Sequence, residues 1–194
     1  MSRSVEICMI TTPDGAIEVS GRSRPLGGPA DQRHLISLRE RASVILVGAG
    51  TARGEGYGAP SKQGLRIGVV TLSCDMDFAS PLFASGAGFI VTTTSAPAVP
   101  VDSICAGETT VDLAGVIAQL PDGIIHVEGG PQLNAALLDA DLVDAINLTF
   151  SPKLTGARGL SLAEAPHSLR RFSLASTEVR DNFVFARYVR TTTA

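Results

Sequence analysis

An acidic residue, two glycines and a proline stand together where an apolar run ends, at Glu128-Gly129-Gly130-Pro131. A helix that begins at Pro131 leaves its first N–H groups without partners inside the helix. Together with the helix dipole these groups attract a phosphate. The glycines allow a ligand to approach the backbone closely. This junction is therefore a candidate phosphate-binding site.

Two carboxylates lie beside junctions of this kind. Glu128 stands at the exit of the apolar run, where it is placed to face a pocket and accept hydrogen bonds from a neutral polar ligand. Because carboxylates are rarely buried without a partner, we favour this role over that of a solvated turn glutamate. Asp14, in Pro13-Asp14-Gly15, follows the first apolar run. It is a candidate for a catalytic or orienting role, and the same tripeptide is equally typical of a simple turn.

A second glycine-rich junction spans residues 46–58. Gly48 and Gly50 follow an apolar run, as in a Rossmann motif, but that motif requires a long helix, which the glycines of residues 54–58 disfavour. We expect a short turn and an irregular loop here. Glycine motifs of this length occur with and without a ligand.

The elements that position these residues follow from hydrophobic periodicity. Apolar, β-branched runs predict buried strands at residues 5–11, 43–48, 66–72, 88–93, 123–128 and 144–150. Helical periodicity marks residues 29–42, 112–120 and 131–142, and alternation around Asp181-Asn182 predicts a terminal hairpin. The sequence predicts one α/β domain over residues 1–194, with a mostly parallel sheet, helices on both faces and an antiparallel edge. Ligands of such sheets bind at the carboxyl ends of the strands.

Composition excludes several functional classes. The net charge of −3 gives no electrostatic case for binding nucleic acid or an anionic membrane. No apolar stretch approaches the roughly 20 residues of a membrane helix, and the N-terminus lacks the pattern of a signal peptide. Three cysteines (Cys8, Cys74 and Cys105) are odd in number and lack metal-ligand spacing. We therefore expect reduced thiols in a cytoplasmic protein, with neither a metal site nor a disulfide framework.

Three segments together resemble a known family: Asp14-Gly15, residues 37–53 and residues 127–154. They resemble the reductase domain of bacterial riboflavin biosynthesis, the pyrimidine reductase half of a bifunctional deaminase-reductase, whose fold is similar to that of dihydrofolate reductase. The most specific part is Glu-Gly-Gly-Pro followed by "LLDADLVD" and "SPKL". The resemblance implies NADPH as hydride donor, 5-amino-6-(5-phosphoribosylamino)uracil or a related pyrimidine as substrate, and a homodimer.

The resemblance also implies roles for individual residues. With the glycine junction described above, it places cofactor contacts at Gly48, Gly50, Thr51, Thr71, Ser73, Gly129, Gly130, Pro131, Gln132 and Leu133. It places substrate contacts at Ser23, Arg39 and Glu128, although Arg39 alone is typical of a solvated helix arginine. Hydride transfer leaves a nitrogen that needs a proton from an acid or a held water, and the catalytic candidates are Asp14 and Glu128.

The chain departs from the family pattern on the substrate side. Ala16 replaces a basic residue, Pro25 replaces a tryptophan, and Glu55 is the one plausible acid in the segment after Thr51. Two other functions therefore stay open: an NADPH-dependent reductase of a pterin such as dihydrofolate, and a nucleotide-binding module without catalysis. We expect no deaminase activity, because the zinc-binding pattern of that half does not occur in the sequence.

Overall fold

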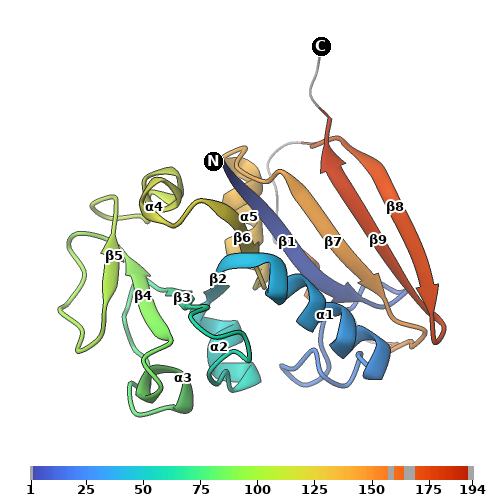
Figure 1. The fold of residues 1–194 in the computed structure, drawn as a ribbon, viewed down its shortest axis with the longest axis horizontal. Coiled ribbons are helices and arrows are strands. Elements are labelled where there is room, and N and C mark those ends of the chain that lie inside the picture. Colours follow the sequence, from blue (N-terminus) through green and yellow to red (C-terminus); the bar gives the residue numbers. More distant parts are fainter. Residues whose placement is uncertain (1, 157–159, 164–168, 192–194) are drawn as a thin grey trace.

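The computed structural model describes residues 2–156, 160–163 and 169–191, and these residues build one twisted sheet with helices on both sides (Figure 1). The strand order is β5-β4-β3-β2-β6-β1-β7-β9-β8. The strands are β1 (Arg3–Thr11), β2 (Ala42–Gly48), β3 (Ile67–Val70), β4 (Gly88–Thr92), β5 (Ser103–Cys105), β6 (Gly123–Val127), β7 (Ala145–Phe150), β8 (Phe172–Arg180) and β9 (Phe183–Arg190). The helices are α1 (Pro29–Arg41), α2 (Ala49–Glu55), α3 (Pro81–Ala84), α4 (Leu113–Gln119) and α5 (Pro131–Asp139).

The sheet is parallel from β5 to β7 and antiparallel at its other edge, where β9 pairs with β7 and β8 pairs with β9. This arrangement confirms the predicted fold class. The turn between β8 and β9 is made by Asp181 and Asn182, whose φ angles are +51° and +65°. Two central residues with positive φ match the twist of a two-residue hairpin, and aspartate and asparagine tolerate that conformation.

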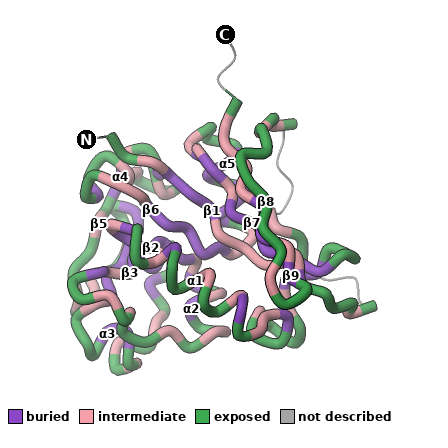
Figure 2. The backbone as a smooth tube through the Cα atoms, turned by 45° about the vertical axis from the view of Figure 1, so that its right-hand side comes forward, coloured by how far each residue is buried: buried purple, intermediate pink, exposed green. Residues whose placement is uncertain are grey.

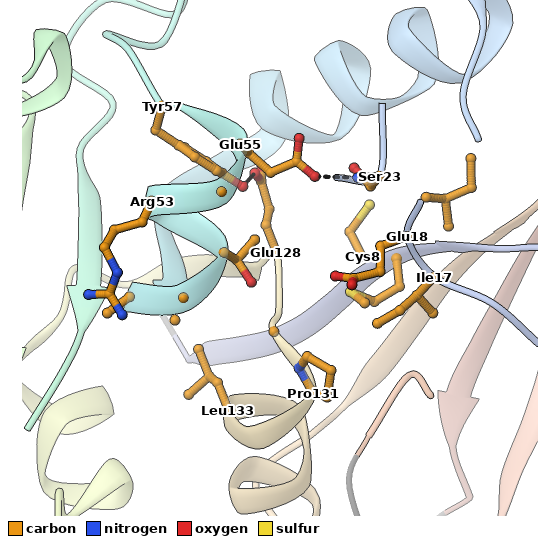
Figure 3. Close-up of a pocket in the computed structure, with 18 of the residues that line it drawn as sticks. Cys8, Ile17, Glu18, Ser23, Arg53, Glu55, Tyr57, Glu128, Pro131 and Leu133 are labelled. Carbon is orange, nitrogen blue, oxygen red and sulfur yellow. Dashed lines mark hydrogen bonds between the residues drawn. The ribbon is translucent and has the colours of Figure 1, made fainter. Parts of the chain in front are cut away.

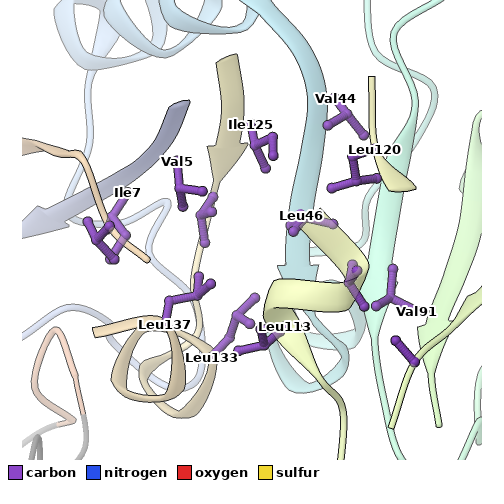
Figure 4. Close-up of a cluster of buried hydrophobic side chains, with 14 of the residues drawn as sticks. Val5, Ile7, Val44, Leu46, Val91, Leu113, Leu120, Ile125, Leu133 and Leu137 are labelled. Atoms are coloured by element: carbon purple, nitrogen blue, oxygen red, sulfur yellow. The ribbon is translucent and has the colours of Figure 1, made fainter. Parts of the chain in front are cut away.

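Alternation along the central strands places apolar side chains on both faces of the sheet. Val44 and Leu46 of β2 belong to the core on the side of α4 and α5, whereas Ile45 and Val47 belong to the core on the side of α2 and α3. Figure 4 shows the first of these cores, where Leu133 and Leu137 of α5 lie under the strands. Burial on both faces explains why these strands are continuous apolar runs in the sequence.

A third apolar cluster attaches α1 to the antiparallel edge. Ala30 of α1 packs with Phe183 and Phe185 of β9, and all three are buried. The outer strand β8 is exposed along most of its length (Figure 2). As a result α1 crosses the sheet on the side of α2, and one side of α1 faces the carboxyl ends of the strands.

Three elements were not predicted from the sequence. β5 has three mainly exposed residues and α3 has four residues, too few for a periodic signal. The expected turn after β2 is instead the seven-residue helix α2. Burial of Ala49 and Ala52 against the sheet offsets the cost of its internal glycines, about 1 kcal/mol each. The helix ends at Gly56, whose φ of +67° is the left-handed conformation typical of a helix end. None of the described helices is both long and apolar enough to span a membrane.

Candidate active site

A cavity of about 1510 Å³ opens at the carboxyl ends of β1, β2, β3 and β6 (Figure 3). Its walls come from the loop before α1, from one side of α1, from α2 and the loop that follows it, and from the first turn of α5. The parallel strands bring these segments together because all of their carboxyl ends meet at one edge of the sheet.

One part of the cavity collects the residues predicted to bind the cofactor. All of them except Gly129 line it: Gly48, Gly50, Thr51, Thr71, Ser73, Gly130, Pro131, Gln132 and Leu133. The two glycine junctions, which are separate in the sequence, are in contact. The Gly48 N–H donates to the Gly129 carbonyl at 2.6 Å, and a Cβ on Gly48 would lie 3.1 Å from Gly130 N.

Gly129 connects these junctions without lining the cavity. Its φ is +80°, and a Cβ there would lie 2.8 Å from Met9 Sδ. Both facts favour glycine at this position. Other residues rarely adopt a left-handed conformation, and the Met9 side chain fills the space that a Cβ on residue 129 would occupy. Its predicted contact with the cofactor stays a prediction, and the structure gives Gly129 a backbone role in joining β2 to the start of α5.

The start of α5 has the features of an anion site. Pro131 occupies the first turn, Gly130 is the extended residue before it, and no side chain in the described part of the chain caps the helix. The N–H groups of Gln132 and Leu133 therefore belong to the unpaired set at a helix start. A Cβ on Gly130 would lie 2.7 Å from Thr51 Oγ1, so glycine keeps this approach to the helix open. These residues fit a pyrophosphate.

A second part of the cavity is built around Glu128. Its side chain is 6% exposed, and both carboxylate oxygens have partners. Arg39 donates from Nε to Oε1 at 2.7 Å and from Nη2 to Oε2 at 2.6 Å. The Tyr57 hydroxyl donates to Oε2 at 2.6 Å, and Figure 3 shows Tyr57 beside Glu128. His126 Nε2 lies 3.3 Å from Oε1, in ion-pair range but without hydrogen-bond geometry. The predicted substrate residues Arg39 and Glu128 are thus partners of each other.

These contacts fix the protonation of the cluster. Burial alone would raise the pKa of Glu128, but the contacts with His126 and Arg39 outweigh it and lower the pKa to about 2. We attribute most of this effect to Arg39, because its two hydrogen bonds are short and well directed. Burial and the Glu128 carboxylate raise the pKa of Tyr57 well above 10. At neutral pH the cluster therefore holds a carboxylate, a guanidinium and a neutral phenol.

Arg39 is not a solvated helix arginine. Its side chain is 24% exposed and lines the cavity. The Glu128 carboxylate raises the pKa of Arg39 above its ordinary value, although burial alone would lower it. Nε and Nη2 are used by Glu128, and Nη1 has no hydrogen-bond partner among the described residues. Arg39 can therefore offer donors to a ligand while Glu128 holds its position.

Asp14 and Ser23 lie on the loops between β1 and α1. Asp14 is not among the described residues that line the cavity, and its carboxylate accepts hydrogen bonds from the Thr12 hydroxyl and from Gly156 N at 2.9 Å. These groups lower the pKa of Asp14 to about 2. Ser23 does line the cavity, and its N–H donates to Glu55 Oε1 at 2.5 Å (Figure 3). The structure thus gives Asp14 a loop-linking role, and its catalytic role stays a prediction.

Several cavity residues were missed by sequence reasoning. Tyr57 lies in an irregular loop, where no periodic pattern indicates which way a side chain points. Asp31 and Leu35 share a wall of the cavity with Arg39. Their spacing of four residues was a usable signal, because residues four apart lie on the same side of a helix.

Comparisons with known proteins agree on one family of folds. The profile of the RibD C-terminal domain family matches residues 3–185. No curated protein sequence is significantly similar to the chain. The crystal structure of a pyrimidine reductase-like protein from Corynebacterium diphtheriae is 25% identical with a TM-score of 0.82, over 98% of this chain and 92% of that one.

Two further structures are similar at lower identity. A diaminohydroxyphosphoribosylaminopyrimidine deaminase/5-amino-6-(5-phosphoribosylamino)uracil reductase from Thermotoga maritima is 19% identical with a TM-score of 0.75, over 98% of this chain and 57% of that one. The chain thus spans little more than half of that bifunctional protein. Dihydrofolate reductase from Enterococcus faecalis complexed with NADP(H) is 15% identical with a TM-score of 0.66, over 97% of each chain. Both likenesses show the fold.

Proposed function

The chain belongs to the RibD C-terminal domain family, and from this membership we propose that it reduces a pyrimidine intermediate of riboflavin biosynthesis with NADPH. The candidate substrates are 5-amino-6-(5-phosphoribosylamino)uracil, which the name of the Thermotoga maritima protein specifies for that relative, and related pyrimidines. The observation that carries the proposal is the shared cavity. The joined glycine junctions and the Arg39–Glu128 pair line the same space, so a cofactor and a substrate can meet there.

NADPH fits the first part of the cavity. The uncapped start of α5 and the approach kept open by Gly130 suit a pyrophosphate, and Thr71 and Ser73 at the end of β3 are placed for the adenosine ribose and its phosphate. When bound, NADPH would supply a hydride to C1′ of the ring-opened imine form of the ribosylamine, so that the C1′=N double bond becomes a single bond and the nitrogen takes up a proton. The side chains of this chain supply orientation and charge.

The second part of the cavity orients the substrate. Arg39 offers donors to substrate oxygens, and Glu128 holds the guanidinium with two hydrogen bonds. Both Glu128 and Asp14 have pKa values near 2, which argues against either as proton donor at neutral pH. We propose that a held water gives the proton to the nitrogen, and that Glu128 acts by positioning Arg39.

The activity is tested by following NADPH oxidation with each substrate alone. We expect faster turnover of 5-amino-6-(5-phosphoribosylamino)uracil than of dihydrofolate, and weaker activity when NADH replaces NADPH. Rapid turnover of dihydrofolate without turnover of the pyrimidine would instead support a pterin reductase. Tight NADPH binding without oxidation by either compound would support a nucleotide-binding module.

We also propose that the protein is a cytoplasmic homodimer that pairs through its antiparallel edge. Phe183 and Phe185 of β9 cover the core, so the opposite face of the hairpin is left for a partner. On that face Leu174, opposite Tyr188, is 56% exposed, and Val179 is 69% exposed. Light scattering at micromolar concentration should give twice the 20.1 kDa mass of the chain. A monomer at that concentration would contradict the proposal.

A further inference from the structure

One side of α1 presents three different side chains to the cavity. Asp31, Leu35 and Arg39 all line it. Their spacing of four residues places them in a row along the helix, and the eight-residue separation of Asp31 and Arg39 corresponds to about 12 Å along the axis. The row therefore offers a carboxylate, an apolar surface and a guanidinium in that order.

Asp31 differs from Glu128 in its partners. Among the described residues no Lys, Arg or His lies within ion-pair distance of its carboxylate. The hydroxyl of Thr149 on β7 favours the charged form of this carboxylate, and Thr149 is a buried residue that also lines the cavity. Burial raises the pKa of Asp31, and Thr149 and the charge of Lys153 only partly offset this effect.

The surrounding loop holds this carboxylate in place. A Cβ on Gly27 would lie 2.7 Å from Asp31 Oδ2, so the loop before α1 packs directly on the carboxylate. Lys153 fixes that loop by donating to the carbonyls of Pro25 and Gly27, both at 2.7 Å. The Lys153 ammonium therefore donates its hydrogen bonds to backbone oxygens. The Asp31 carboxylate can still accept hydrogen bonds from a ligand.

The chemistry of a matching ligand follows from this arrangement. A partly buried carboxylate is stabilised by donors, and two adjacent N–H groups match its two oxygens best. A 2-amino-4-oxopyrimidine ring offers such a pair in its 2-amino group and its N3–H. In the corresponding uracil an oxygen replaces the 2-amino group, so N3–H stands between two acceptors that a carboxylate repels.

We propose that Asp31, positioned by Thr149, contacts the substrate ring at C2 and N3 and selects a 2-amino-4-oxopyrimidine over the corresponding uracil. This inference rests on the proposed function and specifies which related pyrimidine the cavity prefers. Leu35 then lies under the ring, and Arg39 meets acceptor groups farther along the substrate.

The test compares two substrates that differ only at C2: 2,5-diamino-6-(5-phosphoribosylamino)pyrimidin-4-one and 5-amino-6-(5-phosphoribosylamino)uracil. The wild-type protein should favour the 2-amino compound by at least about tenfold in kcat/KM, the value of one charged hydrogen bond. Asp31→Asn should abolish the preference and leave NADPH affinity unchanged, and Thr149→Val should weaken the preference. Glu40→Gln removes the same charge from an exposed position of α1 and should retain the preference.

A binding measurement separates this inference from the proposed function. Calorimetry with 2-amino-6-methylpyrimidin-4-one and 6-methyluracil requires no turnover. If neither phosphoribosyl compound oxidises NADPH, the proposed function is wrong, and the calorimetric comparison still tests Asp31. Equal or tighter binding of 6-methyluracil to the wild-type protein would overturn the inference. A preference for the 2-amino ring that survives in Asp31→Asn would overturn it as well.

Discussion

Replacing Gly130 by valine is expected to lower the affinity for NADPH by at least about a hundredfold, equivalent to about 2.7 kcal/mol. Gly130 lies where the two glycine junctions meet, and a Cβ there would lie 2.7 Å from Thr51 Oγ1. A valine side chain would occupy the approach to the uncapped start of α5, where the pyrophosphate is proposed to bind. Since Leu133 and Leu137 keep their buried positions, the fold should persist.

Fluorescence or calorimetric titration with NADPH measures this effect, and a thermal melt checks the fold. Ala140→Val is the matched control, because it adds similar bulk at the exposed far end of α5. The control should bind NADPH like the wild-type protein. Wild-type affinity in Gly130→Val would remove the start of α5 from the cofactor site.

Glu128→Gln is expected to reduce turnover by about a hundredfold while NADPH affinity is retained, because loss of orientation in a site typically has an effect of that size. The carboxylate now accepts three short hydrogen bonds, two from Arg39 and one from Tyr57. An amide has one acceptor oxygen, and its NH₂ group would face donors. Arg39 would therefore lose its fixed position against the substrate. The same change leaves a partly buried cation without its partner, which typically costs about 3–5 kcal/mol of unfolding free energy.

Stability of this variant should also depend less on pH. Because the pKa of Glu128 is lowered to about 2 in the folded protein, its contribution is fully present above pH 4.5 and is lost as the pH falls toward 2. The contribution is about 3 kcal/mol by this shift. Urea unfolding of the wild-type protein should show the loss, and Glu128→Gln should lack this component.

Tyr57→Phe serves as the matched variant for this cluster. It removes one hydrogen bond to the carboxylate and leaves the Arg39–Glu128 pair intact. Its loss of stability should be smaller, about 1.5–3 kcal/mol. Turnover and stability both unchanged in Glu128→Gln would mean that the Arg39 cluster has no role in the site.

The sequence predicted the sheet well because its central strands are buried on both faces. The runs that became β2 and β4 are continuous, mainly apolar and mostly buried, and such a run predicts a buried strand without knowledge of the rest of the fold. β5 was not predicted because it is short and mainly exposed. α2 was not predicted because its glycines disfavour a helix. Its contact with the sheet stabilises it, and this contact cannot be inferred from the local sequence.

The sequence predicted many of the residues of the site but not which of them form hydrogen bonds with each other. Glu128 was identified from its place at a strand exit, but its partners Arg39 and Tyr57 lie 89 and 71 residues away in the sequence. Asp14 was identified from its turn, but its partner Gly156 lies 142 residues away. Such contacts are set by the order of strands in the sheet, which local periodicity does not specify. Family resemblance contributed the cofactor residues, and all but Gly129 line the cavity.

The most direct test of the proposed reaction is transfer of deuterium from NADPH labelled at C4 of the nicotinamide. Each of the two C4-deuterated forms is incubated with the protein and a phosphoribosylaminopyrimidine, and the product is analysed by mass spectrometry and NMR. We predict that one form delivers a single deuterium to C1′ of the new ribityl chain, and that Gly130→Val and Glu128→Gln greatly slow this transfer. Two results would contradict the proposed function. One is the absence of deuterium at C1′ under conditions where NADPH is bound. The other is that a parallel incubation with dihydrofolate gives labelled tetrahydrofolate while the pyrimidine product carries no label.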